Sequence, residues 1–177
     1  MLIISDIFEY VAKIITPTSP PGCRVCCVGS TALRAYLPEG DIDLILIHPG
    51  YFNNISSTIA NSSVGTGSDS GKQALFAVFT AIFAAVENAN NPIPKNLNIR
   101  NVEFINARTS VVNCTINNCK VDITINQIGA VATTTFLEEC AQVIGNNNLF
   151  KRSMILIKVR YLHRTYSVLY CYSDICC

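Results

Sequence analysis

The stretch from Val25 to Ile47, V-C-C-V-G-S-T-A-L-R-A-Y-L-P-E-G-D-I-D-L-I-L-I, constrains the fold of this chain most. Its two apolar ends are joined by a Gly-Ser turn, a short helical segment and a Pro-Glu-Gly turn. This pattern predicts a strand, a brief helix and a second strand that opens with Asp41 and Asp43. Alternate residues of a strand point to the same side, so the two carboxylates share one face, about 7 Å apart along the strand.

Two carboxylates at the start of an otherwise apolar strand need a compensating positive charge. Mg²⁺ is the economical candidate, because it prefers oxygen ligands and is commonly bound by one or two carboxylates together with substrate phosphates. Gly29 and Ser30 supply a complementary feature. Glycine lets a backbone approach a ligand closely, and a turn that leads into a helix presents N–H groups to an anion. We interpret the stretch as a phosphate cradle beside a metal-binding carboxylate pair.

The composition indicates a folded chain without a strong overall field. Of the 177 residues, 50% are hydrophobic and 14% are charged, and the net charge is +1. This balance argues against disorder, and the length suffices for one domain with a core, or for one domain and part of another. The longest apolar run, residues 74–86, is too short to span a membrane, and the first residues lack a signal peptide pattern. We therefore expect an intracellular protein, cytoplasmic or nuclear, with no membrane partner.

Nine cysteines are many for this length, and Cys23 and Cys26 form a C-x-x-C pair. A zinc site usually needs a second such pair or a Cys/His pair at matching spacing, and the sequence has neither. We expect reduced thiols, mostly buried in strands.

Hydrophobic periodicity predicts alternating helices and strands, which indicates an α/β or α+β fold with a mixed sheet. A polar segment rich in Asn, Ser, Thr and Gly, residues 53–71, is predicted to be a flexible insertion. The predicted helices span residues 3–15, 31–36, 72–88, 133–144 and 150–165. The predicted strands span residues 25–28, 41–47, 102–116, with a break near 106–107, and 120–125, with Asn117-Asn118 as the turn before the last.

Asp122 is the lone acidic residue of the last predicted strand. If that strand neighbours the one with Asp41 and Asp43, three carboxylates meet and can hold two metal ions about 3.5–4 Å apart. The alternative is a solvated aspartate at a sheet edge.

Four blocks of sequence, in order, resemble the polymerase-β-like nucleotidyltransferase superfamily: Gly29-Ser30, L-P-E-G-D-I-D-L at 37–44, V-D-I-T-I-N-Q at 121–127, and F-K-R-S-M-I-L-I-K at 150–158. The most similar branch is the poly(A) polymerase and terminal uridylyltransferase group with its poly(A) polymerase/oligoadenylate synthetase substrate-binding domain. The resemblance implies a nucleotidyltransferase palm with a mixed β-sheet flanked by helices, plus a partial helical lobe. The palm would span residues 18–131, and residues 1–17 and 132–177 would form the lobe, shorter here than in the family.

The same resemblance implies a template-independent enzyme that adds nucleotides from ATP or UTP to an RNA 3′ end and releases pyrophosphate. Two Mg²⁺ or Mn²⁺ ions would serve as cofactors. The implied roles are metal binding and catalysis for Asp41, Asp43 and Asp122, triphosphate binding for Gly29, Ser30 and Lys158, and proximity to the nucleotide sugar for Asn126 and Gln127.

Two other interpretations stay open at this point. The last residues, 166–177, match no family motif, and Ile128-Gly129-Ala130 stands where many relatives have Thr-Gly-Gly or Thr-Ala-Gly. A catalytically weak or silent palm could act as an interaction module or need a protein partner to complete its cleft. A minimal nucleotidyltransferase could instead modify a protein. The last predicted helix carries five basic residues, which either form a stripe that faces phosphate groups or are simply the solvent-exposed face of the helix: Lys151, Arg152, Lys158, Arg160 and Arg164.

Overall fold

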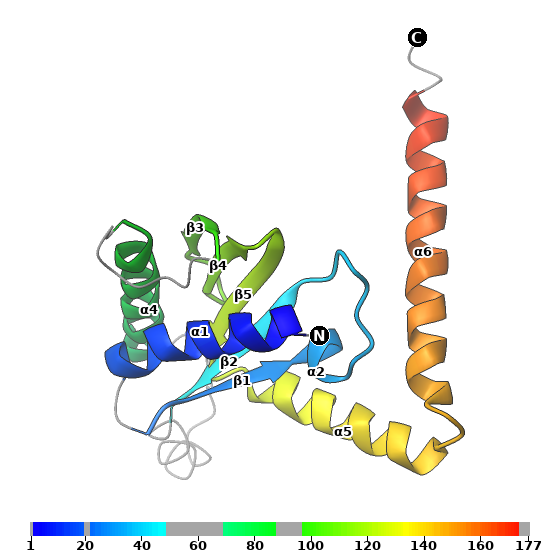
Figure 1. Cartoon of the computed structure of the whole chain (residues 1–177), viewed down its shortest axis with the longest axis horizontal. Helices are drawn as coiled ribbons and strands as arrows, with labels where there is room; N and C mark the ends of the chain where they lie inside the picture. The colour runs from blue at the N-terminus through cyan, green and yellow to red at the C-terminus, as the bar shows by residue number, and fades with distance from the viewer. Residues whose placement is uncertain (1, 20–21, 49–68, 88–96, 174–177) are drawn as a thin grey trace.

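The computed structural model describes residues 2–19, 22–48, 69–87 and 97–173 of the chain (Figure 1). Most of the predicted insertion therefore lies outside the described residues, and residues 69–71 of it begin a helix. The helices are α1 (Leu2–Thr18), α2 (Gly29–Ala32), α4 (Asp69–Glu87), α5 (Ile128–Ile144) and α6 (Leu149–Ser173). The strands are β1 (Arg24–Val28), β2 (Ile42–Ile47), β3 (Ile99–Ile105), β4 (Val111–Ile116) and β5 (Cys119–Ile125).

The five strands form one mixed sheet in the order β1-β2-β5-β4-β3, which confirms the predicted fold class. The pair β2/β5 is parallel, and the other neighbouring pairs are antiparallel. β5 thus lies at the centre of the sheet, between β2 and β4. Parallel neighbours need a long crossover, and here the chain passes through α4, β3 and β4 between β2 and β5.

The hydrophobic core lies between one face of this sheet and the helices α1 and α4 (Figure 1). The helices contribute residues at helical spacing, and the strands contribute every second residue, because side chains of a strand alternate between the two faces. The fully buried members include Ile7, Val11 and Ile15 of α1, Leu75, Val78 and Ile82 of α4, Leu44 of β2, and Val121 and Ile123 of β5. These helices therefore anchor the sheet from one side and leave the other side to the site.

The helices α5 and α6 follow β5 and extend away from the sheet (Figure 1). Lys151 of α6 donates to both carboxylate oxygens of Glu138 on α5 at 2.8 Å, which joins the two helices. Lys158 of α6 donates to the backbone carbonyl of Ala35 at 2.9 Å. These contacts hold the first half of α6 to α5 and to the segment after α2. The division into a palm and a helical lobe stays a prediction.

Six cysteines are free thiols: Cys23, Cys26, Cys27, Cys114, Cys119 and Cys140. Cys114 is fully buried, and burial raises its pKa to about 12. In the described part of the chain, no helix is both long and apolar enough to cross a membrane.

Candidate metal and nucleotide site

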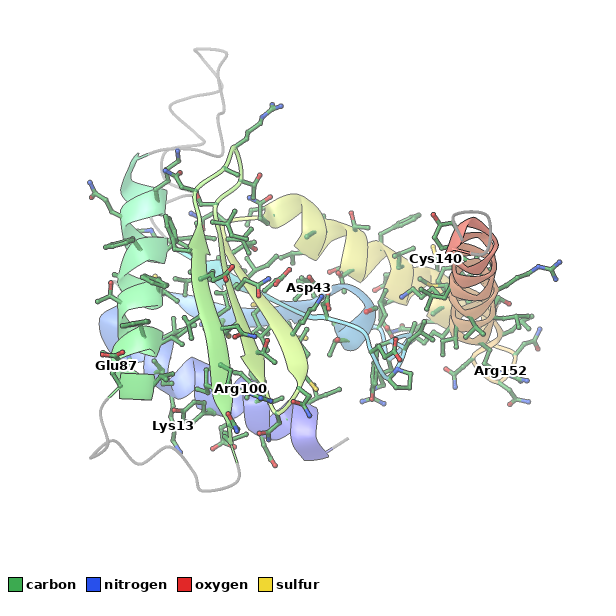
Figure 2. The ribbon with its side chains drawn as sticks, turned by 90° about the horizontal axis from the view of Figure 1, so that it is seen from above. Lys13, Asp43, Glu87, Arg100, Cys140 and Arg152 are labelled. Atoms are coloured by element: carbon green, nitrogen blue, oxygen red, sulfur yellow. The ribbon has the colours of Figure 1, made fainter. Side chains whose placement is uncertain are left out.

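Asp43 and Asp122 lie directly opposite each other on the parallel strands β2 and β5. Their neighbours Ile42, Leu44 and Ile123 are buried in the core, so both carboxylates point to the face of the sheet that faces away from α1 and α4. Figure 2 shows Asp43 on the side of the sheet away from α4. Neighbouring strands are about 4.8 Å apart. The predicted meeting of carboxylates from separate segments is therefore present, with Asp41 exposed just before β2.

The electrostatics of this face of the sheet favour a bound cation. Burial raises the pKa of Asp43, and the negative charges of Asp122 and Asp41 raise it further, while Lys158 opposes them. Burial also raises the pKa of Asp122, with a further rise from Asp41 that Lys120 opposes. A bound cation would relieve this repulsion, because a nearby positive charge favours the ionised form of a carboxylate.

The donor set fits a hard cation that shares its ligands with a substrate. Among the described residues, no three His, Cys, Asp or Glu side chains are gathered closely enough to hold a metal ion by themselves. Mg²⁺ is typically bound by one or two carboxylates together with waters and substrate phosphates. Asp43 and Asp122 provide such a pair, and the remaining ligands would come from a triphosphate and water.

Gly29 packs directly against the Asp43 carboxylate. Its φ is +67°, a conformation that favours glycine, and a Cβ at this position would lie 2.7 Å from Oδ2 of Asp43. The backbone N–H of Gly29 donates to Oγ1 of Thr134 on α5 at 2.9 Å. That amide is therefore occupied by α5 rather than free for a phosphate. Ser30 follows Gly29 within the four-residue helix α2.

Lys158 is the predicted site residue farthest along the sequence from Asp43, and it acts on that carboxylate through its charge. Its ammonium group is held by the carbonyl of Ala35, and its charge lowers the pKa of Asp43. Two other basic residues of α6 do not share this position. Lys151 is paired with Glu138, and Arg152 lies far from Asp43 in Figure 2.

Asn126 and Gln127 lie where β5 ends and α5 begins. The side-chain oxygen of Asn126 accepts a hydrogen bond from the backbone N–H of His48 at 2.9 Å, and its own N–H donates to Leu46. These bonds fix the carboxyl ends of β2 and β5 to each other. Gln127 is the residue before α5 and lines a small hollow with Lys72, Arg108, Ser110 and Ile125.

Two residues of the site were not predicted from the sequence, Asn113 and Thr134. Asn113 of β4 lies opposite Asp122 and donates from Nδ2 to Oδ1 of that carboxylate at 2.7 Å. The predicted Asn117-Asn118 turn contained the signal, because pairing outward from a two-residue turn brings residue 113 opposite residue 122. Thr134 carries no comparable signal, since its contact with Gly29 depends on how α5 packs.

The chain was compared with protein-family models, with curated protein sequences and with solved structures. No protein-family model matches the chain, and no curated protein sequence matches it significantly. Solved structures do match. The structure of the GLD-2/RNP-8 complex has a TM-score of 0.64 at 15% identity and covers 94% of this chain. The chain has the fold of RNA terminal nucleotidyltransferases.

Two uridylyl transferases extend this finding. The RNA terminal uridylyl transferase Cid1 gives a TM-score of 0.60 at 15% identity over 89% of this chain. Terminal uridylyl transferase 4 from Trypanosoma brucei with bound GTP gives 0.57 at 15% identity over 78%. The chain spans 40% of the Cid1 chain, 39% of the trypanosome chain and 54% of the matched chain of the GLD-2/RNP-8 complex. The resemblance stated from sequence is thereby confirmed at the level of the fold.

Proposed function

We propose that this chain carries the palm of an RNA nucleotidyltransferase that adds nucleotides from ATP or UTP to an RNA 3′ end without a template. The observation that supports it most directly is the opposed pair of Asp43 and Asp122 on parallel strands, with a glycine backbone against Asp43. The terminal transferase fold of the matched structures supports the same reaction class. One of those structures, of the Cid1 poly(U) polymerase, has MgGTP bound.

In this proposal, Asp41, Asp43 and Asp122 would hold two Mg²⁺ or Mn²⁺ ions, which lower the proton affinity of the attacking hydroxyl and neutralise charge on the phosphate oxygens. Gly29 allows the Asp43 carboxylate to sit against the backbone. Ser30 and Lys158 would bind the triphosphate, because a hydroxyl and an ammonium group both donate to phosphate oxygens. Asn126 and Gln127 would border the nucleotide sugar.

The reaction would exchange one phosphate bond for another. The RNA 3′-oxygen forms a bond to the α-phosphorus, the bond from that phosphorus to the bridging oxygen breaks, and pyrophosphate leaves while the hydroxyl proton is lost to water. Most of the acceleration would come from positioning and electrostatic stabilisation, since the carboxylates themselves form no bond to the substrate.

Nucleotide incorporation by the purified chain tests this proposal. The chain is incubated with an RNA oligonucleotide, Mg²⁺ or Mn²⁺, and each of the four labelled triphosphates in turn. We expect the RNA to be extended, and extension to be lost in Asp43→Asn. Glu103→Gln is the matched control. Glu103 lies on β3, opposite Asn113 of β4, and is therefore two strands away from Asp122 on β5.

The acceptor distinguishes this proposal from the other two interpretations. In a second reaction the RNA is replaced by a mixture of RNA and proteins. Label on a protein and none on RNA would overturn the RNA acceptor and favour a protein-modifying enzyme. Absence of label on either acceptor, with all four triphosphates and both metals, would overturn the proposed activity for this chain. The next test would then be whether a protein partner, as in the GLD-2/RNP-8 complex, completes the cleft and restores activity.

A further inference from the structure

Asn113 extends the row of polar side chains across three strands of the sheet. β2 contributes Asp43, β5 contributes Asp122 opposite it, and β4 contributes Asn113 opposite Asp122. The Asn113 amide nitrogen is 2.7 Å from Oδ1 of Asp122. This contact is short for an N–H···O bond, whose usual distance is about 2.9–3.0 Å.

The chemistry of the two groups fixes the direction of this hydrogen bond. An ionised carboxylate can only accept, whereas an asparagine amide offers both an acceptor and a donor. The amide must therefore present its nitrogen to Asp122, as observed. Hydrogen bonds to an ionised group are roughly twice as strong as neutral ones. Asn113 thus restrains Oδ1 on the β4 side, while Oδ2 of Asp122 accepts no hydrogen bond from the described residues.

The position of Asn113 is unusual for its residue type. Asparagine is depleted in β-strands, yet Asn113 lies inside β4 between the buried residues Val112 and Cys114. The next residue on the same face is Thr115, a good strand former, which lies opposite Lys120. The carboxylate of Asp122 provides the reason for an amide at residue 113.

We propose that Asn113 is a positioning residue that orients the Asp122 carboxylate for metal binding, so that Oδ2 is the oxygen offered to the ion. This inference rests on the proposed function, because it requires Asp122 to bind a metal. Residues that hydrogen-bond to metal ligands typically contribute 10–100-fold to metal affinity. Asn113 itself touches neither the ion nor the substrate in this proposal.

Binding of Mn²⁺ alone to the full chain tests the role of Asn113 without turnover. The amount of free Mn²⁺ is followed by electron paramagnetic resonance for the wild type, Asn113→Leu, Asp122→Asn and Thr115→Val. Leucine keeps the branching and the number of side-chain heavy atoms of asparagine but has no donor. We expect Asn113→Leu to bind Mn²⁺ about 10–100-fold more weakly and Thr115→Val to bind as the wild type does. Thermal unfolding by circular dichroism verifies that each variant is folded.

Each outcome decides one of the two proposals. If Asp122→Asn weakens Mn²⁺ binding and a folded Asn113→Leu does not, the positioning role is wrong and the metal site stands. If the wild type binds Mn²⁺ no better than Asp122→Asn does, the metal site fails, and the proposed function with it. If Asn113→Leu does not fold, Asn113→Thr replaces it, since threonine suits a strand and is too short to reproduce the amide contact.

Discussion

The two faces of the central sheet differ in what they do, although they are built from the same strands. On the face covered by α1 and α4, Leu44 and Ile123 are fully buried in the core. On the opposite face their sequence neighbours Asp43 and Asp122 are half-buried, and each raises the local demand for positive charge. Strand alternation thus places Leu44 and Ile123 in the core and Asp43 and Asp122 on the opposite face.

This division explains how a carboxylate pair with raised pKa values can persist in a folded chain. Apolar burial contributes roughly 25 cal/mol per Å² of surface removed from water, and the helix-covered face provides that burial from both strands. The pair on the other face costs stability through repulsion and partial burial. A site of this kind therefore depends on the core directly behind it.

The largest effect is expected on the covered face. Ile123→Ala removes a fully buried side chain and should lower the free energy of unfolding by about 2–5 kcal/mol, as measured by urea titration. Asp122→Asn, one residue earlier, should leave that free energy unchanged or raise it at neutral pH, because it removes a repelled charge. Equal destabilisation by the two variants would contradict the division between the faces.

Nucleotide incorporation should be reduced more by Asp122→Asn than by Ile123→Ala, the reverse of their effects on stability. Asp122→Asn should reduce nucleotide incorporation by at least about a hundredfold, ~2.7 kcal/mol of barrier, because it removes a proposed metal ligand. Residues that only hydrogen-bond to such ligands already contribute 10–100-fold. Thr124→Val, which lies on the same face one step further along β5, should retain most of the activity. Comparable losses in both variants would mean that the face as a whole, rather than the carboxylate, is required.

Gly29 and Gly129 form a matched pair for the packing against Asp43. Gly29→Ala would place a Cβ at 2.7 Å from Oδ2 of Asp43 at a φ of +67°, so we expect a loss of about 1–3 kcal/mol in stability together with lower activity. A Cβ at Gly129, within α5, meets nothing within 4 Å. Gly129→Ala should therefore stabilise the chain by about 0.5–1 kcal/mol. Urea unfolding of the two variants and the wild type measures both effects.

The pH dependence of stability gives a smaller test of the carboxylate face. The pKa values of Asp43 and Asp122 are raised above 3.8 in the folded chain. As pH rises above 3.8, the unfolded chain loses these protons first, so it binds fewer protons and the free energy of unfolding falls. Asp43→Asn should lose less stability over this range than the wild type in the presence of EDTA. Mg²⁺ should reduce the difference if it binds the folded pair.

The smallest effect is expected at the junction of α5 and α6. Lys151 is 15% exposed and holds both oxygens of Glu138, whereas Lys13 and Glu9 are 76% and 74% exposed. Lys151→Ala should cost about 1 kcal/mol, near the upper end for partly exposed pairs, and Lys13→Ala about 0–0.3 kcal/mol. Thermal unfolding measures both losses, and equal losses in Lys151→Ala and Lys13→Ala would contradict this ranking of the two ion pairs.

The sequence predicted those parts of the fold that depend on local pattern. The strands of the Val25–Ile47 stretch and the helix pattern of α4 follow from periodicity and from Gly and Pro. The prediction started β3 at residue 102 instead of Ile99, because a register shift between Arg100 and Glu103 interrupts the alternation. α5 begins at Ile128 rather than residue 133, since its first turn contains Gly129 and is weakly periodic.

The site was predictable as far as its acidic residues and no further. Asp41, Asp43 and Asp122 stand out because they are acidic residues within or directly beside apolar strands. Their proximity required the parallel pairing of β2 with β5, which is a property of the whole sheet. Thr134 and Lys158 reach Gly29 and Ala35 through the packing of α5 and α6, and local pattern contains no measure of such packing.

The central place of β5 has a consequence for how the site comes into being during folding. β5 pairs with β2 on one side and β4 on the other, so the β1–β2 hairpin alone carries Asp41 and Asp43 with no opposing carboxylate. The proposed ion site is complete only when β5 has inserted between β2 and β4. Affinity for a divalent ion would therefore report that the final strand has docked, and added Mg²⁺ would favour the fully assembled sheet over partly folded forms.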